Sequence, residues 1–459
     1  MKFRFLAFAL AALFIVVIFS LAQHLRWFAL PAVALESMRW LVIGLFAVYG
    51  VHRRSLTTWI LVGTAAGIEF GHDWPAAALG LQIFGTIFLR LIKVLIAPLL
   101  FSTLVVGIAG HADLKKVGRI GVKALIYFEV VSTLALLIGF AAIHVSRAGE
   151  GVQLPSGGAA PAVELAPHSA KDMIVGAFPE NIAKAVTDGE VLQIVVFSVL
   201  FGIALAMVPE AKRRPLLAFT ESLAETMFKF TNIVMLFAPI GVFGAIAYTV
   251  GHLGLGILMP LVKLLATMYV ALAIFVLGVL LPIAAIIRVP VKRFLTAVAE
   301  PVTIAFATAS SEAALPRAME EMESIGVPRE IVALVLPAGY SFNLDGSSLY
   351  QSLALVFVAQ AAGIHLGIGQ QLVMLLTLLI SSKGVAGVAR ASLVVVLATA
   401  TTFHFPLEPV FLLFGIDQLM DMARSGVNVL GNCLATLVIA RWEGETRAFD
   451  ALEVSESGL

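Results

Sequence analysis

The strongest constraint on the fold is a series of apolar runs, most of them about as long as a bilayer is thick. A helix needs about 20 residues to cross the hydrocarbon core of a membrane. Only 13% of the 459 residues are charged, about half the share that is usual in soluble proteins. A β-barrel would show short alternating segments instead, so we expect an all-α polytopic membrane protein. The runs span residues 5–21, 83–108, 124–145, 261–287 and, with an interruption, 372–397.

Charge indicates the orientation of the chain. Lys and Arg gather in short loops near residues 115–119, 212–214 and 288–293, which the positive-inside rule makes cytoplasmic. We expect both termini to be cytoplasmic in a bacterial inner membrane, with the Gly- and Pro-rich stretch 146–189 outside. A net charge of +1 gives no reason to expect a nucleic-acid partner, and the single cysteine, Cys433, excludes an intrachain disulfide.

The N-terminus allows two interpretations. Residues 1–23 have the basic start and apolar core of a signal peptide, and they also suit a retained membrane anchor. A second apolar run, 40–51, ends at His52-Arg53-Arg54. Two retained helices would put Lys2, Arg4 and this basic cluster on the cytoplasmic side. We therefore favour two extra N-terminal membrane helices within residues 1–54.

The second half of the chain places polar residues at membrane depth. The stretch Asn343-Leu344-Asp345-Gly346-Ser347-Ser348 interrupts an apolar segment, and irregular backbone is tolerated there only beside a cavity or buried in protein. We expect Gly346 and the two serines to break a helix and to supply ligands. Residues 306–316 and 378–396 are further Ser-, Gly- and Ala-rich interruptions. Broken helices and hairpins of this kind build the sites of secondary transporters.

The last apolar segment carries a polar stripe. Asp417, Asp421, Arg424, Asn428 and Asn432 are spaced by three or four residues, so that they share one face of a helix. A charged residue at membrane depth is costly and faces a partner or a wet cavity. The alternative is a helix packed inside the bundle, in which Asp421 and Arg424 form only a structural ion pair.

Several motifs resemble those of one family. "SSEAALP", "GYSFNLDGSSLYQS", "SSKGVAGV" and "MDMARSGVNVLGN" are similar to signatures of the dicarboxylate/amino acid:cation symporters, the glutamate transporter homologues, over about Leu56 to Glu445. The resemblance implies a homotrimer in which a scaffold supports a transport domain that moves like an elevator. It divides the chain into two extra helices (1–54), mainly scaffold (55–289, with 118–146 in the transport domain), the transport core (290–445) and a cytoplasmic tail (446–459). Within the core it implies re-entrant hairpins at about 293–322 and 369–405, a broken helix at 326–362 and a last helix at 407–440.

The resemblance also implies roles for residues. Arg424 would hold the side-chain carboxylate of aspartate or glutamate, because its planar fork suits two parallel hydrogen bonds. Asp421 would bind the ammonium group, and Asn428 and Ser311 the α-carboxylate. The expected substrate-binding residues are Ser310, Ser311, Ser347, Val388, Asp421, Arg424, Ser425 and Asn428.

The coupling ion is expected to be a proton. Sodium-coupled members carry Asp where this chain has Asn432, and hydroxyl residues where it has Phe128 and Val131, so a Na⁺ cage would lack oxygen ligands. Glu129 is either a proton carrier or a packing residue. The expected coupling residues are Glu129, Asn343, Asp345, Asp417 and Asn432, and we expect no organic cofactor and no structural metal.

Two features leave the substrate class open. The tip of the second hairpin reads Val388-Ala389-Arg390 where the family has Val-Pro-Gly, and Glu312 resembles the C4-dicarboxylate branch. The leading hypothesis is a proton-coupled symporter of glutamate and aspartate, and the runner-up is a proton- or sodium-coupled symporter of C4-dicarboxylates. Asp421 separates the two, because a carboxylate attracts an ammonium group and repels a second carboxylate.

Two hypotheses from other classes fit less well. An intramembrane aspartyl protease would need Asp345 and Asp421 to share a proton, but Arg424, one turn away, would keep Asp421 ionised. A channel is disfavoured, because two hairpin gates and a carboxylate clamp fit a carrier better. We therefore do not expect an enzyme.

Overall fold

The computed structural model describes residues 14–20, 31–53, 55–110, 116–152, 178–188, 191–382 and 391–445, with a few single residues besides. Every regular element in these ranges is a helix, which confirms the all-α prediction for them. Five spans are long and apolar enough to cross a membrane, and a sixth would be a pair of helices bent by 48°. They are Val33–Arg53, Pro75–Val106, Arg119–Ser146, Leu255–Ile286 and Glu408–Trp442, with the bent pair Glu210–Leu236 and Ala238–Leu253.

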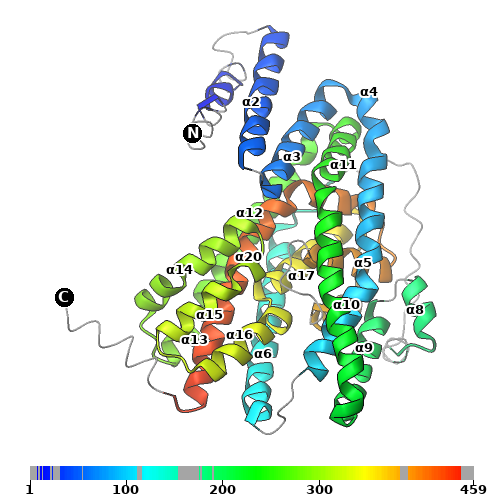
Figure 1. Ribbon diagram of the computed structural model, residues 1–459. Helices are drawn as coiled ribbons and strands as arrows, with labels where there is room; N and C mark the ends of the chain where they lie inside the picture. The colour runs from blue at the N-terminus through cyan, green and yellow to red at the C-terminus, as the bar shows by residue number, and fades with distance from the viewer. Residues whose placement is uncertain are drawn as a thin grey trace, which may run out of the picture.

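Most helices of the first half of the chain form a group on one side of Figure 1, whereas α6 lies among the helices of the second half. Helix α3 packs along α11, and α5 lies against α9, α10 and α11. Three glycines four residues apart on α3 meet the backbone of α11, where a Cβ on Gly63 would lie 2.5 Å from the Pro239 carbonyl oxygen. Small residues allow such close approach of helices in a membrane. The helices are α2 (Ala32–Arg53), α3 (Leu56–Asp73), α4 (Pro75–Ala78), α5 (Gln82–Ala109), α6 (Lys116–Ser146), α8 (Ile182–Asp188), α9 (Val191–Met207), α10 (Glu210–Leu236) and α11 (Ala238–Leu253).

The second half forms the other group, around α20. Helix α20 contacts α12, α14, α16 and α17, and α17 also packs against α6. Because α17 is apolar after its first turn and almost wholly buried, it lies inside the bundle. The helices are α12 (Leu258–Phe275), α13 (Leu281–Ile286), α14 (Val291–Thr308), α15 (Leu315–Ser324), α16 (Arg329–Phe342), α17 (Asp345–Ala361), α18 (Ile368–Ser381), α19 (Ala391–Thr402) and α20 (Glu408–Trp442).

The broken helix is present, but the break lies earlier than the sequence suggested. Helix α16 ends at Phe342, and Asn343 and Leu344 have non-helical backbone angles. Helix α17 already begins at Asp345, so that Gly346 and the two serines lie in its first turn. The carboxylate of Asp345 is favourable at the N-terminus of α17, because a helix N-terminus carries partial positive charge.

Two helix pairs lie where hairpins were expected. Helix α14 ends at Thr308, the next residue, Ala309, adopts a left-handed backbone (φ 52°), and α15 returns to pack against α14. That conformation costs an L-residue about 1–2 kcal/mol and often marks a functional turn. Helices α18 and α19 also contact each other, but the tip between them, with Val388, Ala389 and Arg390, lies outside the described residues.

The N-terminal extension contributes at least one long helix. Helix α2 packs against α3 and rises beside it at the top of Figure 1. Residues 14–20 are also helical. Arg39 on α2 forms ion pairs with Glu69 (2.7 Å) and Asp73 (3.3 Å) of α3, and the Trp40 indole donates to Asp73 (2.9 Å). These contacts hold α2 against the first helix of the region that resembles the symporters.

Candidate functional site

The polar stripe of the last helix is buried, as its spacing predicted. Asp417, Asp421, Arg424, Asn428 and Asn432 all lie on α20, and each side chain is at least 96% shielded from solvent. Buried polar groups at this density are costly unless they are paired. The stripe therefore needs partners from the helices that surround α20.

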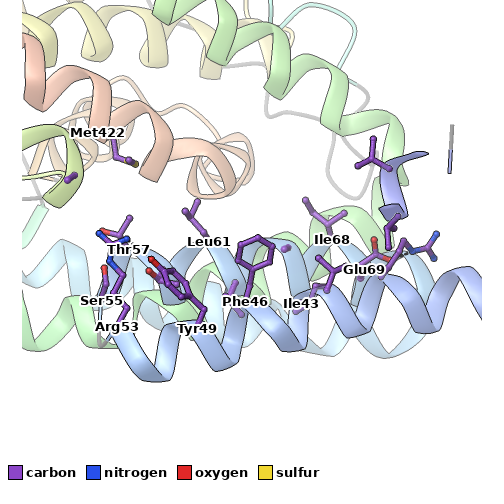
Figure 2. A pocket seen from close by; sticks show the side chains of 18 of the residues that line it. Ile43, Phe46, Tyr49, Arg53, Ser55, Thr57, Leu61, Ile68, Glu69 and Met422 are labelled. Carbon is purple, nitrogen blue, oxygen red and sulfur yellow. Dashed lines mark hydrogen bonds and ion pairs between the residues drawn. The ribbon is translucent and has the colours of Figure 1, made fainter. Parts of the chain in front are cut away.

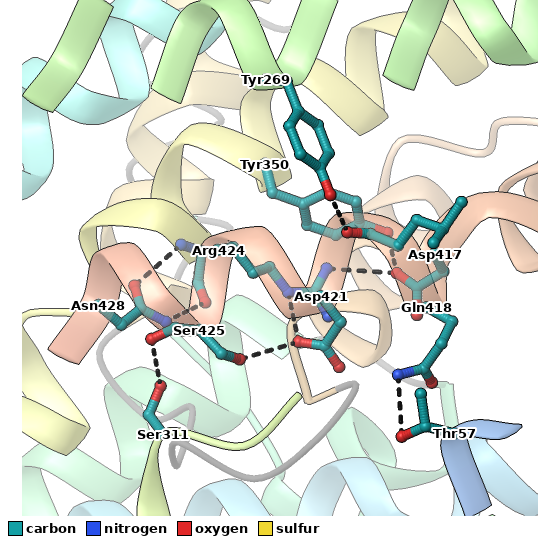
Figure 3. Close-up of polar contacts among 12 residues, drawn as sticks. Thr57, Tyr269, Ser311, Tyr350, Asp417, Gln418, Asp421, Arg424, Ser425 and Asn428 are labelled. Atoms are coloured by element: carbon teal, nitrogen blue, oxygen red, sulfur yellow. Dashed lines mark hydrogen bonds and ion pairs between the residues drawn. The ribbon is translucent and has the colours of Figure 1, made fainter. Parts of the chain in front are cut away.

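Arg424 is the centre of the first group of contacts (Figure 3). Its Nε lies 2.8 Å from Asp421 Oδ1, and its Nη1 lies 3.2 Å from Asp417 Oδ1. The guanidinium carbon sits 4.1 Å from the ring centroid of Tyr350, whose hydroxyl donates to Asp417 (2.9 Å). A buried cation thus stands between two carboxylates and over an aromatic face, an arrangement that favours a fixed guanidinium.

One nitrogen of this guanidinium is still available. Arg424 Nη2 is buried and makes no hydrogen bond to any residue that the structure describes. A buried donor left unsatisfied costs about 1–3 kcal/mol. Because two carboxylates and one guanidinium carry a net charge of −1, the group can accept a ligand that brings both a carboxylate and a cationic group.

Hydroxyl and amide groups extend the site along α20 toward the α14–α15 turn. Ser311 Oγ donates to the carbonyl oxygen of Ser425 (3.3 Å), and Ser425 Oγ donates to Asp421 Oδ1 (3.3 Å). Asn428 accepts from the Ser347 backbone amide (3.3 Å) and donates to Ser347 Oγ (3.1 Å). Asp421, Ser425 and Ser311 are therefore linked to Arg424 by hydrogen bonds, whereas Ser347 and Asn428 form a separate pair on the same side of α20.

Gly346 explains how α17 comes so near to α20. A Cβ at this position would lie 2.5 Å from the Arg424 carbonyl oxygen and 2.9 Å from its Cα. No side chain fits there without movement of the backbone. The glycine therefore serves close packing, which lets Ser347 reach Asn428.

A second buried group lies one turn further along α20. Asn343 Nδ2 donates to Asn432 Oδ1 (3.0 Å) and to Asp345 Oδ2 (3.2 Å), and all three side chains are fully buried. The side-chain oxygen of Asn343 (Oδ1) and the side-chain nitrogen of Asn432 (Nδ2) make no hydrogen bond within the described ranges. The break in the helix thus brings side-chain oxygen and nitrogen atoms next to α20.

The structure separates the predicted coupling residues. Asn343, Asp345 and Asn432 form the second group, whereas Asp417 belongs to the group around Arg424. Glu129 is apart from both, because its side chain is exposed on the outer face of α6. Of the predicted substrate residues, Ser310 is half-buried at the α14–α15 turn, and Val388 falls in the segment that is not described.

The sequence comparisons identify the family. Residues 56–442 match the model of the sodium:dicarboxylate symporter family. A proton/glutamate-aspartate symporter of Escherichia coli is 43% identical over 407 residues, which are 85% of this chain and 93% of that protein. The chain belongs to the sodium:dicarboxylate symporter family.

Relatives within this family carry different names. A proton/sodium-glutamate symport protein of Geobacillus stearothermophilus is 42% identical over 396 residues (84% of this chain, 94% of that protein). A C4-dicarboxylate transport protein of Paraburkholderia phymatum is 42% identical over 398 residues (84% and 92%). The family assignment made from the motifs is confirmed, and overall identity does not choose between the amino acid and dicarboxylate branches.

Two tyrosines of this family member join the site without having been predicted. Tyr350 packs on Arg424 and bonds Asp417. Its position three residues after Ser347, on the same helical face, was the available signal. Tyr127 on α6 is buried, and its hydroxyl is close enough to Asp345 for an electrostatic interaction. It supplies a hydroxyl beside Phe128, where the sequence had suggested that one was lost.

Proposed function

We propose that this protein is a secondary active symporter that takes up glutamate or aspartate together with protons. The observation that carries the proposal is the buried pair of Arg424 and Asp421, whose Nε and Oδ1 lie 2.8 Å apart. An acidic amino acid brings a side-chain carboxylate and an ammonium group, which match this cation and this anion. Binding would replace one internal ion pair by two pairs to the substrate.

The remaining polar groups suit the α-carboxylate. Ser311 and Asn428 offer a hydroxyl and an amide beside the ion pair. Ser347 and Ser425 would line the pocket. Val388 would close it from the second hairpin. A carboxylate that accepts several such hydrogen bonds is bound more strongly than by a single charge alone.

Proton coupling is the second part of the proposal. Asp345 is buried with the amides of Asn343 and Asn432, and Asn432 stands where sodium-coupled members are expected to have a second carboxylate. A cage with one carboxylate holds Na⁺ weakly, since hard cations need anionic oxygens. We assign Asp345 as the main proton carrier, with Asp417 as a group that responds to substrate through Arg424.

C4-dicarboxylate uptake is the second candidate. It is favoured by the relatives that bear that name and by Glu312, which is half-buried next to the α14–α15 turn. Asp421 opposes it, because its carboxylate would repel the carboxylates of succinate, which brings no ammonium group to offset that repulsion. The same residue therefore decides between the two substrates.

The mechanism and assembly are proposed on the same grounds. We infer an elevator motion in which α6, α14–α20 and their hairpins move against a trimeric scaffold that includes α3, α5, α9, α10 and α11. The two groups of helices in Figure 1 are in keeping with such a division. We place the protein in a bacterial inner membrane, with the basic loops and both termini in the cytoplasm.

Uptake into proteoliposomes tests the substrate and the ion together. We expect radiolabelled aspartate or glutamate to accumulate when an inward proton gradient is imposed. The rate of this uptake should not change when Na⁺ is replaced by K⁺. Strict dependence on Na⁺ at fixed pH would refute proton coupling. Faster uptake of succinate than of aspartate would transfer the proposal to the C4-dicarboxylate branch.

Two carboxylates provide a matched comparison for the coupling site. Asp345→Asn removes the buried carboxylate and should abolish gradient-driven uptake while leaving exchange of internal for external substrate. Glu129→Gln removes a carboxylate of the exposed face of α6 and should leave driven uptake intact. The reverse pattern would make Glu129 the carrier and overturn the role of Asp345.

A further inference from the structure

A large cavity lies between the N-terminal extension and the symporter fold. Its volume is about 1020 Å³, and Figure 2 shows its walls. One wall comes from α2 and another from α3, and Val16 and Val17 of the first apolar segment contribute to it. Phe306, Ala307 and Met422 belong to the transport core and close the remaining side.

The middle of the cavity is apolar, and its distance from the Arg53 end matches the thickness of one lipid leaflet. Ile43, Phe46, Leu61 and Ile68 point into it from α2 and α3 (Figure 2). Ile43 and Arg53 are ten residues apart on one helix, which is about 15 Å along its axis. Half of the hydrocarbon core of a bilayer is also about 15 Å thick. In a membrane, an opening of this shape matches an acyl chain.

The two ends of the cavity differ in charge. At one end Arg39 is neutralised by Glu69 and Asp73, with the ion pairs given above. At the other end Arg53 donates to the Tyr49 hydroxyl (2.8 Å), and no carboxylate of the described residues lies within ion-pair distance of it. Ser55, Thr57 and Thr58 add hydroxyl groups at the same end. This end therefore attracts an anionic group that accepts hydrogen bonds.

We propose that the cavity is a binding site for an anionic membrane phospholipid, with its phosphate against Arg53 and one acyl chain between α2 and α3. The extension that forms this site lies outside the part of the chain that matches the family, residues 56–442. Because Phe306 lies near the α14–α15 turn and Met422 adjoins Asp421 in sequence, the lipid would touch both the extension and the elements that carry the candidate substrate site.

Photolabelling in vesicles tests this proposal. The full chain is reconstituted with phosphatidylglycerol that bears a photoreactive group in its acyl chain, and the labelled residues are mapped. We expect label to concentrate on the cavity-lining residues of α2 and α3, and unlabelled phosphatidylglycerol, but not phosphatidylcholine, to compete with it. Even labelling of all lipid-facing helices, or equal competition by phosphatidylcholine, would overturn the proposal.

Matched variants separate a built site from general lipid contact. Ala65→Trp fills the cavity and should remove most of the label, whereas Val48→Trp, on a part of α2 that does not line the cavity, should not. Arg53→Gln should lower the labelling by about fivefold, the effect of one basic residue on an anionic lipid. Arg214→Gln removes a charge from another loop and should change nothing.

Folding and assembly are controlled within the same experiment. Each variant is compared by size-exclusion profile, and Ala65→Phe replaces Ala65→Trp if the larger side chain impairs folding. Protection of the cavity by a second copy of the chain would leave it unlabelled in the wild type and would also overturn the proposal. Because the measurement is labelling and not uptake, it is independent of whether the substrate assignment holds.

Discussion

Replacement of Asp421 by Asn is the most informative perturbation of the candidate substrate site. The asparagine keeps the size of the side chain and an oxygen acceptor for Arg424 Nε, which lies 2.8 Å from Asp421 Oδ1 in the native protein. What disappears is one negative charge. The buried group of Asp417, Asp421 and Arg424 changes its net charge from −1 to 0, so that it no longer favours a ligand that carries an ammonium group.

The size of the effect follows from the burial. Asp421 is only 3% exposed, and truncating one partner of a buried charge pair costs about 2–4 kcal/mol. At 1.4 kcal/mol for each factor of ten, the affinity for aspartate should fall by roughly 30- to 1,000-fold. Succinate has no ammonium group and loses no such contact. Its affinity should stay the same or increase, because a repelling carboxylate has been removed.

Calorimetric titration of the purified protein with aspartate and with succinate measures both changes. Ser425→Ala is the matched control, since it removes the hydrogen bond to Asp421 (3.3 Å) without changing the charge. We expect this variant to lose much less affinity for aspartate. Equal weakening of aspartate and succinate in Asp421→Asn, with the protein still folded, would refute the assignment of Asp421 to the ammonium group.

Three further predictions concern the clamp, the packing and the cytoplasmic end of α20. Arg424→Lys keeps the charge but loses the planar fork. In the same titration the affinity for aspartate should therefore fall more than tenfold, which corresponds to about 2 kcal/mol of binding free energy. Unchanged affinity would exclude Arg424 as the residue that binds the carboxylate. Gly346→Ala places a Cβ against the Arg424 carbonyl and should destabilise the protein by about 1–3 kcal/mol, which a lower melting temperature would show. Gly369→Ala is the control, because Gly369 has open space around it, and it should leave the melting temperature unchanged. Desolvation raises the pKa of Glu443, but hydrogen bonds from Lys123 and Arg119 outweigh it and hold that pKa below its usual value. A lowered carboxylate pKa stabilises the fold above the unfolded value of about 4.3 and loses this effect as the pH falls through the folded value. Protection of the end of α20 against hydrogen exchange, measured relative to the intrinsic exchange rate, should therefore fall only below about pH 4, and not at all in Glu443→Gln.

The sequence alone determined the class of the protein and the location of the candidate site. Long uncharged runs leave a chain few choices besides membrane helices, because lipid satisfies no backbone hydrogen bond. The spacing of the polar residues on α20 could be read as one buried stripe, since charged side chains at membrane depth must face one another. The motifs that carry these residues were enough to predict the family.

The tertiary structure decided which of these residues act together. The family resemblance assigned Asp417 to the cation site, but in the structure Asp417 contacts Arg424 directly, and Tyr350 of α17 touches both residues. The sequence left Glu129 as either a carrier or a packing residue, and only the rotation of α6 shows that its side chain is exposed while that of Tyr127 is buried. Periodicity along one helix says which residues share a face, but only contacts between helices say what that face meets.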